Sequence, residues 1–127
     1  NISCTWQLPP YPIFVECSKD QMKQVLLNIT KNAFESMGNG GELTVNLLTD
    51  TVSCKIEIVD TGKGISNEEI QKIFHPFYTS KDTGTGLGLV VCKRLLHSFG
   101  GTIQISSKES KGTKVVITLP LVDKDST

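Results

Sequence analysis

Two asparagines lie one helical turn apart in residues 18–37, a segment whose apolar spacing predicts an α-helix. At ~100° per residue, four polar side chains share one arc of this helix: Asn28, Lys31, Asn32 and Glu35. Amide oxygens can ligate a hard cation such as Mg²⁺, and amide NH₂ groups can bond phosphate. The arc is therefore a candidate phosphate and cation site, although an ordinary solvated helix face has the same polarity.

A second candidate is Asp60, which follows a strand-like run directly and precedes the glycine loop of residues 61–65. An ionised carboxylate only accepts hydrogen bonds, so it can take the exocyclic NH₂ of adenine. Gly62 and Gly64 would let the backbone approach a flat ring closely. A plain Asp-x-Gly turn would have the same sequence, and this alternative stays open here.

A third candidate is the segment Gly84-Thr85-Gly86-Leu87-Gly88-Leu89, which opens a strongly apolar predicted helix. A helix start presents free backbone N–H groups and a positive dipole end, which together form a ready phosphate site. The segment is neither the G-x-G-x-x-G of dinucleotide folds nor a Walker loop. A flexible hinge into a buried helix is the alternative.

Between the last two candidates lies a polar stretch, residues 78–84, without apolar periodicity, which predicts a mobile loop. Phe74-His75-Pro76-Phe77 precedes it, where Pro76 would stiffen the turn and the two phenylalanines would fix it to the body. Lys81 lies inside the loop and could swing a positive charge onto a terminal phosphate. A solvated loop lysine is the alternative.

The elements that must position these residues alternate between strands and helices. Strand-like runs cover residues 13–17, 42–48, 54–59, 102–106 and 113–119, and helical patterns cover 18–37, 67–74 and 86–99. One apolar arc of the first helix should pack on the sheet: Met22, Val25, Leu26, Ile29, Ala33 and Met37. The sequence predicts an α/β (α+β) fold, a two-layer sandwich with a mixed, mostly antiparallel sheet of about five strands and about three helices on one face.

Composition limits the class of protein. The chain has 127 residues, enough for a single domain spanning 1–127, and its 13 Lys and Arg balance 13 Asp and Glu, which argues against nucleic-acid binding. Its four cysteines form no C-x-x-C pair or metal-ligand spacing, so buried thiols in a reducing cytosol are expected. There is no signal peptide and no apolar run near ~18 residues. We expect a cytoplasmic domain without direct membrane contact, excised from a parent chain that could itself carry a membrane anchor.

Taken in order, these segments resemble the motifs of sensor histidine kinases. Residues 28–33 are similar to the N box, 60–65 to the first glycine box, 74–77 to the F box and 84–89 to the second glycine box. Gly100-Gly101-Thr102-Ile103 and Gly112-Thr113 also resemble this family. The match covers residues 20–120, and Lys-Asn-Ala-Phe-Glu-Ser-Met and Phe-Tyr-Thr-Ser-Lys are similar to kinases of the nitrogen-regulation and sporulation type.

The resemblance implies the GHKL superfamily and its Bergerat-type fold, with ATP and Mg²⁺ held between sheet and helices under a lid at residues 78–84. It implies that Asp60 reads adenine, aided by Thr113 through water, and that Asn32 and Asn28 hold Mg²⁺. The implied catalytic residues are Asn28, Asn32 and Lys81. The implied nucleotide contacts are Asn28, Lys31, Asn32, Asp60, Gly62, Gly64, Ile65, Tyr78, Lys81, Gly84, Thr85, Gly86, Leu87, Gly88, Leu89 and Thr113.

One position departs from the family pattern. Many members carry a basic residue three positions after the second asparagine, where this chain has Glu35. Near a triphosphate Glu35 would be repulsive unless it points away or pairs with Lys31. The phosphate contacts are therefore assigned to Lys31 and Lys81.

The implied function is that of the ATP-binding catalytic domain of a two-component sensor histidine kinase. Its partners would be a separate helical dimerisation domain bearing the acceptor histidine, upstream of Asn1, and a downstream response regulator. His75 is expected to serve turn geometry, and His97 to lie on a helix surface. The isolated chain is expected to be monomeric and to bind Mg-ATP without labelling itself.

Three alternatives remain open. One is a superfamily ATPase, which needs a glutamate as general base four residues before the Mg²⁺-binding asparagine, where this chain has Asn28. Another is a serine kinase of the anti-sigma type, against which the F box argues. The last is an interaction module that keeps the fold without binding nucleotide.

Overall fold

The computed structural model describes residues 2–72 and 86–122, with only the backbone described at 86–88. Several predicted features therefore lie outside the described residues. These are the F box with His75, the lid with Tyr78 and Lys81, and the glycine-box residues Gly84 and Thr85.

Five strands form one sheet: β1 (Ile2–Gln7), β2 (Gly41–Thr49), β3 (Ser53–Asp60), β4 (Thr102–Lys108) and β5 (Gly112–Pro120). Their spatial order is β1-β2-β3-β5-β4. β1 and β2 are parallel, whereas the pairs β2–β3, β3–β5 and β4–β5 are antiparallel. The predicted mixed, mostly antiparallel sheet is confirmed.

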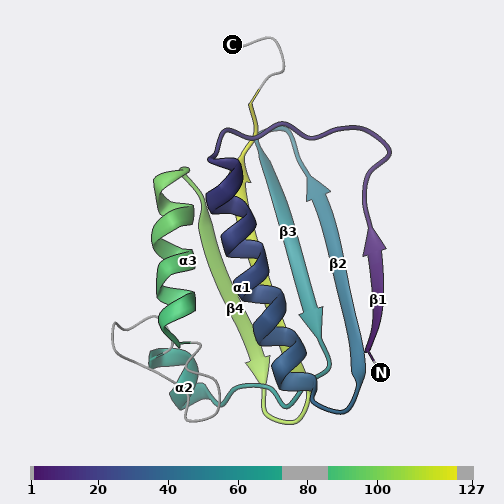
Figure 1. The fold of residues 1–127 in the computed structure, drawn as a ribbon. Coiled ribbons are helices and arrows are strands. Elements are labelled where there is room, and N and C mark those ends of the chain that lie inside the picture. Colours follow the sequence, from purple (N-terminus) through teal and green to yellow (C-terminus); the bar gives the residue numbers. More distant parts are fainter. Residues whose placement is uncertain (1, 73–85, 123–127) are drawn as a thin grey trace.

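Three helices accompany the sheet: α1 (Lys19–Met37), α2 (Asn67–Lys72) and α3 (Gly86–Ser98). The two long helices, α1 and α3, lie side by side on the same face and run in opposite directions (Figure 1). α1 begins where the hydroxyl of Ser18 accepts the N–H of Gln21, and it ends at Gly38, whose φ is +50°. The predicted two-layer sandwich is therefore confirmed, and so is the predicted helix over residues 18–37.

The core lies between α1, α3 and the inward side chains of the strands. Five residues of the predicted apolar arc of α1 are buried: Met22, Val25, Ile29, Ala33 and Met37. Leu26 is only partly buried and packs at the edge of the same cluster. Burying a side chain such as Ile29 stabilises the fold by ~2 kcal/mol, so this arc fixes how α1 is rotated on the sheet. That rotation turns Asn28 and Asn32 toward one side of the helix.

The prediction of a strand at residues 13–17 is wrong. Only Val15 pairs there, in an isolated antiparallel bridge with Leu121. Pro9, Pro10 and Pro12 lie directly before this segment and have no N–H to donate, so the chain cannot enter it from a regular ladder. The remaining strand is β1, which pairs with β2 through contacts distant in sequence that local patterns do not reveal.

The expected buried thiols are confirmed for Cys54 and Cys92, whereas Cys4 is exposed and Cys17 is half-buried. Cys4 lies on edge strand β1, which the helices leave uncovered (Figure 1). In the described ranges, no helix has both the length and the apolar character needed to cross a membrane.

Candidate functional site

Asp60, the last residue of β3, is buried with 7% of its surface exposed. Its Oδ1 accepts three hydrogen bonds: from the Gly62 N–H at 2.8 Å, from the Thr113 N–H at 3.2 Å and, at 3.4 Å, from the Ser36 hydroxyl, which shares its one hydrogen with the Ala33 carbonyl at 2.9 Å. Within residues 2–72 and 86–122, every hydrogen bond that this carboxylate accepts ends on Oδ1. The carboxylate is thus fixed through one oxygen, and Oδ2 accepts no hydrogen bond from the part of the chain that the structure describes.

Burial raises the pKa of Asp60 above its ordinary value, and the hydrogen bonds from Gly62, Thr113 and Ser36 act in the opposite direction. A buried carboxylate is costly to keep ionised, because desolvation disfavours its charged form. A donor supplied by a ligand would offset part of that cost. Asp60 therefore has the environment of a binding residue.

The first glycine loop packs tightly against the rest of the protein. A Cβ on Gly62 would collide with the Ser36 hydroxyl, and one on Gly64, whose φ is +74°, would collide with the Lys108 carbonyl. The Lys63 N–H donates to the Ser36 carbonyl at 3.1 Å. The structure therefore explains these glycines by close contact with α1 and the β4–β5 turn. Their approach to a ligand ring, expected from the sequence, stays a prediction.

Asn28, Asn32 and Ser36 follow one another at one-turn intervals along α1. At one end of this line, the Asn28 side-chain NH₂ donates to Cys92 Sγ of α3 at 3.8 Å. At the other end, Ser36 donates to Asp60. The line therefore joins the α1–α3 interface to Asp60 over about 12 Å, with Asn32 between its ends.

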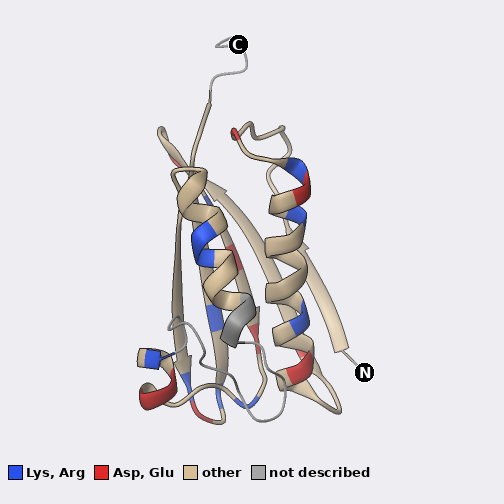
Figure 2. Ribbon diagram, turned by 60° about the vertical axis from the view of Figure 1, so that its left-hand side comes forward, with Lys and Arg blue, Asp and Glu red and all other residues tan. Residues whose placement is uncertain are grey.

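The start of α3 lies at the same end of the molecule as this line. Because α1 and α3 are antiparallel neighbours, one turn forward along α1 corresponds to one turn back along α3 (Figures 1 and 2). Asn28 is level with Cys92, so Asn32, one turn further along α1, is level with the first turn of α3. Leu89 is buried and anchors that turn in the core. The backbone arrangement brings Asn32 level with the helix N-terminus predicted to hold phosphate.

The other described candidates differ in their surroundings. Lys31 and Glu35 are both exposed, and no ion pair joins them within the described residues. Thr113 lies beside Asp60 as expected, but its backbone N–H makes the contact directly. Its hydroxyl instead bonds the Ser107 hydroxyl at 2.9 Å. Ile65 is half-buried and donates its N–H to Ser107 Oγ at 2.7 Å.

Sequence reasoning missed Ser36 and Ser107. Ser36 follows Asn28 and Asn32 at the same four-residue spacing, so the helical period that identified those asparagines also points to it. Ser107 follows Ile103 and Ile105 at alternating positions of β4, which places all three on the inward face. A polar residue at an inward-facing strand position, such as Ser107, is the sequence signal that could have identified it as part of the site.

The described residues also allow a test of whether Mg²⁺ fits this site. They contain no group of three or more His, Cys, Asp or Glu that could hold a metal ion. The half-buried oxygen donors on the polar arc of α1 are the amides of Asn28 and Asn32, whereas the Glu35 carboxylate on that arc is exposed. Mg²⁺ keeps several waters and is usually held by few protein oxygens together with substrate phosphates, so this sparse set fits it.

Over residues 17–123 the chain matches the family of histidine kinase-, DNA gyrase B-, and HSP90-like ATPases. The chain belongs to this family. The resemblance to sensor histidine kinases drawn from the four motifs is thereby confirmed, and ATP is the nucleotide that membership supports.

Similar proteins agree with this assignment. Sporulation kinase D of Bacillus subtilis (strain 168) is 52% identical over 114 residues, covering 90% of this chain and 22% of that protein. The nucleotide-free catalytic domain of histidine kinase ThkA has a TM-score of 0.83 at 30% identity, covering 94% of this chain and 80% of that one. ThkA in complex with response regulator protein TrrA has a TM-score of 0.78 at 25% identity, covering 95% and 34%. This chain therefore spans about a fifth of the length of sporulation kinase D.

Proposed function

We propose that this chain is the ATP-binding catalytic domain of a two-component sensor histidine kinase. It would bind Mg-ATP and transfer the γ-phosphate to a histidine on a separate helical dimerisation domain, for relay to a response regulator. The observation that carries this proposal is the carboxylate of Asp60, which is buried and fixed through Oδ1 and receives no hydrogen bond at Oδ2 from the described residues.

Base recognition follows from the chemistry of Oδ2. The exocyclic NH₂ of adenine is a donor and can complete the hydrogen bonding of Asp60, which offsets the desolvation of its charge. Guanine presents a carbonyl oxygen at the equivalent ring position, and two acceptors would then face each other. The site therefore favours adenine over guanine.

Phosphate binding would use the line of α1 and the start of α3. Asn28 and Asn32 would offer amide oxygens to Mg²⁺, which when bound neutralises phosphate charge. Lys31, exposed on the same helix, and backbone N–H groups at the start of α3 would hold phosphate oxygens. Lys81 is proposed to add a second cation from the lid, and Tyr78, Gly84 and Thr85 to complete the enclosure.

The described residues offer no acceptor for the phosphate close to this site. His97 is exposed in the last turn of α3, about 16 Å along the helix from Gly86. Phosphoryl transfer depends on positioning and charge neutralisation, which Asn28, Asn32 and Lys31 would supply together with the start of α3. We propose that the acceptor histidine lies on another domain, as the resemblance to sensor histidine kinases implies, and we expect this chain to be monomeric and not to label itself. A cytoplasmic location stays a prediction.

The absence of a carboxylate at position 28 bears on the ATPase alternative. A hydrolytic site needs an oriented general base, and a neutral amide such as Asn28 cannot accept a proton usefully at neutral pH. Steady ATP hydrolysis is therefore disfavoured against transfer to a protein histidine.

A change in the ligand tests the proposed recognition. Calorimetry on the unaltered chain with Mg²⁺ would compare ATP, GTP and purine riboside triphosphate, which lacks the exocyclic amine. We expect ATP to bind at least roughly tenfold more tightly than either analogue, the effect of a hydrogen bond to a charged group. Equal affinity for all three would contradict adenine reading by Asp60.

Phosphate transfer needs a separate experiment. The chain would be incubated with γ-labelled ATP, with and without an added helical domain bearing an acceptor histidine. We expect label on the added domain and none on this chain. Strong self-labelling by the chain alone would contradict an external acceptor.

A further inference from the structure

Cys92 of α3 is buried with no exposed surface, and it contacts α1 at two points. Its thiol donates to the Val25 carbonyl at 3.8 Å, and its sulfur accepts the Asn28 side-chain NH₂, also at 3.8 Å. Both contacts bridge the two helices whose interface adjoins the proposed phosphate site. Cys92 thus connects the helix core to one of the two predicted magnesium ligands.

The chemistry of a thiol sets the orientation of this amide. A thiol has one hydrogen, and here that hydrogen is directed at Val25, so the sulfur can act toward Asn28 only as an acceptor. The NH₂ of Asn28 is therefore turned toward α3. Because an amide is planar with its oxygen and nitrogen on different sides of the carbon, Oδ1 is turned away from the sulfur, and it accepts no side-chain hydrogen bond from the residues that the structure describes.

We propose that Cys92 is a positioning residue, which holds the Asn28 amide with its oxygen directed at the Mg²⁺-bound phosphates. This inference rests on the proposed function of the site. It also decides between the two roles that an amide has in principle, ligating a cation and donating to phosphate, in favour of the first for Asn28. Burial of Cys92 strengthens the effect, because water has little access to the sulfur to compete for the NH₂.

The test compares nucleotide binding with and without the metal in Cys92→Ala. We expect the Mg²⁺ concentration for half-maximal ATP binding to rise roughly fivefold, the effect of one hydrogen bond. ATP affinity measured in EDTA should stay at the wild-type value, because the base and the sheet are untouched. Cys92→Ser keeps an acceptor atom and should restore part of the Mg²⁺ dependence.

Cys54→Ala is the matched control. Cys54 is also buried, with 3% of its surface exposed, and burial raises the pKa of both thiols, but Cys54 lies on β3, whereas the Asn28 amide donates to Cys92. The same truncation there should lower thermal stability without changing the Mg²⁺ dependence. Equal changes in the Mg²⁺ dependence for both alanine variants, or equal losses with and without Mg²⁺ in Cys92→Ala, would overturn the proposal.

A second readout needs no ligand and covers the case in which Cys92→Ala folds poorly. The side-chain NH₂ resonances of Asn28, assigned by their loss in Asn28→Ala, would be compared in wild type and Cys92→Ser. We expect the two amide protons to shift when sulfur is replaced by oxygen and to stay unchanged in Cys54→Ala. Unchanged resonances in Cys92→Ser would refute the contact. Failure of the wild type to bind ATP would instead refute the proposed function.

Discussion

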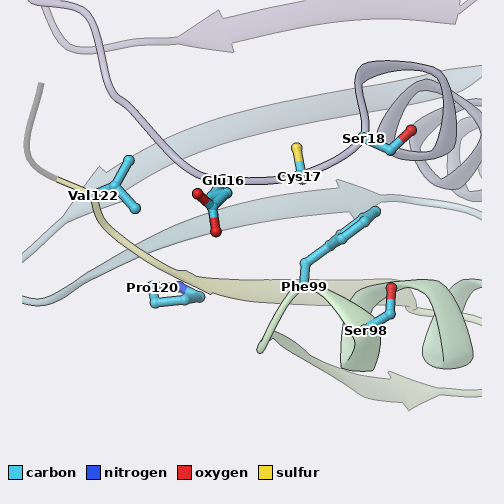
Figure 3. Close-up of a pocket in the computed structure, with 7 residues that line it drawn as sticks. All are labelled: Glu16, Cys17, Ser18, Ser98, Phe99, Pro120 and Val122. Atoms are coloured by element: carbon cyan, nitrogen blue, oxygen red, sulfur yellow. The ribbon is translucent and has the colours of Figure 1, made fainter. Parts of the chain in front are cut away.

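The two ends of the sandwich differ in what fills them. At the end where α1 and β3 finish, Asp60 and Thr113 are buried and joined by hydrogen bonds to Ser36 and Ser107. At the opposite end lies a hollow of about 360 Å³, lined by Glu16, Cys17, Ser18, Ser98, Phe99, Pro120 and Val122 (Figure 3). The candidate site is at the first end. A buried carboxylate that the protein holds through one oxygen identifies the candidate site better than the volume of a cavity does.

The hollow is bordered by segments held mainly through backbone contacts. Val15 pairs with Leu121 in an isolated bridge, and the Val122 N–H donates to the Phe14 carbonyl at 2.9 Å. Its lining comes from the connection before α1, the end of α3 and the end of β5 (Figure 3). None of these residues matches a family motif. We therefore expect substitutions at this end to change stability without changing nucleotide binding.

The largest expected contrast between the two ends is at glycines with positive φ. Gly112 has φ +103°, and a Cβ there would collide with the Asp60 carbonyl, whereas Gly100 has φ +76° and its nearest neighbour would be Pro120 at 3.6 Å. Gly112→Ala should cost more than about 3 kcal/mol of unfolding free energy, and Gly100→Ala only about 1 kcal/mol. Urea unfolding of both variants measures this. Equal losses of unfolding free energy in the two variants would contradict the proposed difference in packing between the two ends.

The next effect concerns the hollow. Phe99→Ala removes a partly buried ring and should lower the unfolding free energy by about 2 kcal/mol. Because distant sites behave independently, ATP affinity should stay within roughly twofold of wild type. Chemical unfolding and calorimetry on the same preparation check both statements. A large loss of ATP affinity would mean that the two ends are coupled.

Ser107 tests the hydrogen bonds at the site end. Its hydroxyl accepts the Ile65 N–H and bonds Thr113, so Ser107→Ala leaves a partly buried donor without its partner. We expect a loss of about 1–2 kcal/mol in unfolding free energy and a weaker affinity for ATP. Ser106→Ala, at an exposed position of the same strand, is the control and should change neither quantity. A change of the same size in the control would contradict the assignment.

The smallest expected effect is a pH dependence of stability from Asp60. Burial raises its folded-state pKa above the ordinary value of 3.8. Stability from the protonated form is therefore present below pH 3.8 and is lost as the pH rises through the folded-state pKa. Asp60→Asn should remove this loss and make the nucleotide-free protein more stable at neutral pH. The measurement is the unfolding free energy of wild type and Asp60→Asn between about pH 3 and about pH 7. A difference between the two proteins that stays constant over this range would contradict the prediction.

Much of this fold follows from local sequence signals. The apolar arc of α1 and the strand-like runs at 42–48, 54–59, 102–106 and 113–119 predict elements that the structure confirms, because each depends on neighbours in the chain. The turn between β2 and β3 is likewise local, since the Asp50 carboxylate accepts the Val52 and Ser53 N–H groups. β1 was missed because its pairing with β2 depends on residues distant in sequence.

The candidate site divides in the same way. Asp60 and the asparagines were identifiable because strand ends and the helical period place them. The sequence does not reveal that Oδ1 of Asp60 accepts hydrogen bonds from the protein, because the donors come from α1, the glycine loop and β5. The contact between Asn28 and Cys92 likewise depends on how two helices pack. Such convergence is a property of the tertiary structure.

The most direct test of the central claim is ATP binding by Asp60→Asn, measured by calorimetry with Mg²⁺. Asparagine can still accept the three hydrogen bonds at Oδ1, but it replaces Oδ2 with a donor that opposes the NH₂ of adenine. The control is Glu57→Gln, which makes the same charge change on the outer face of β3, where Glu57 pairs with Lys114 at 3.4 Å. We predict that Asp60→Asn folds and loses measurable ATP binding while Glu57→Gln binds like wild type. Wild-type affinity in Asp60→Asn would contradict the account.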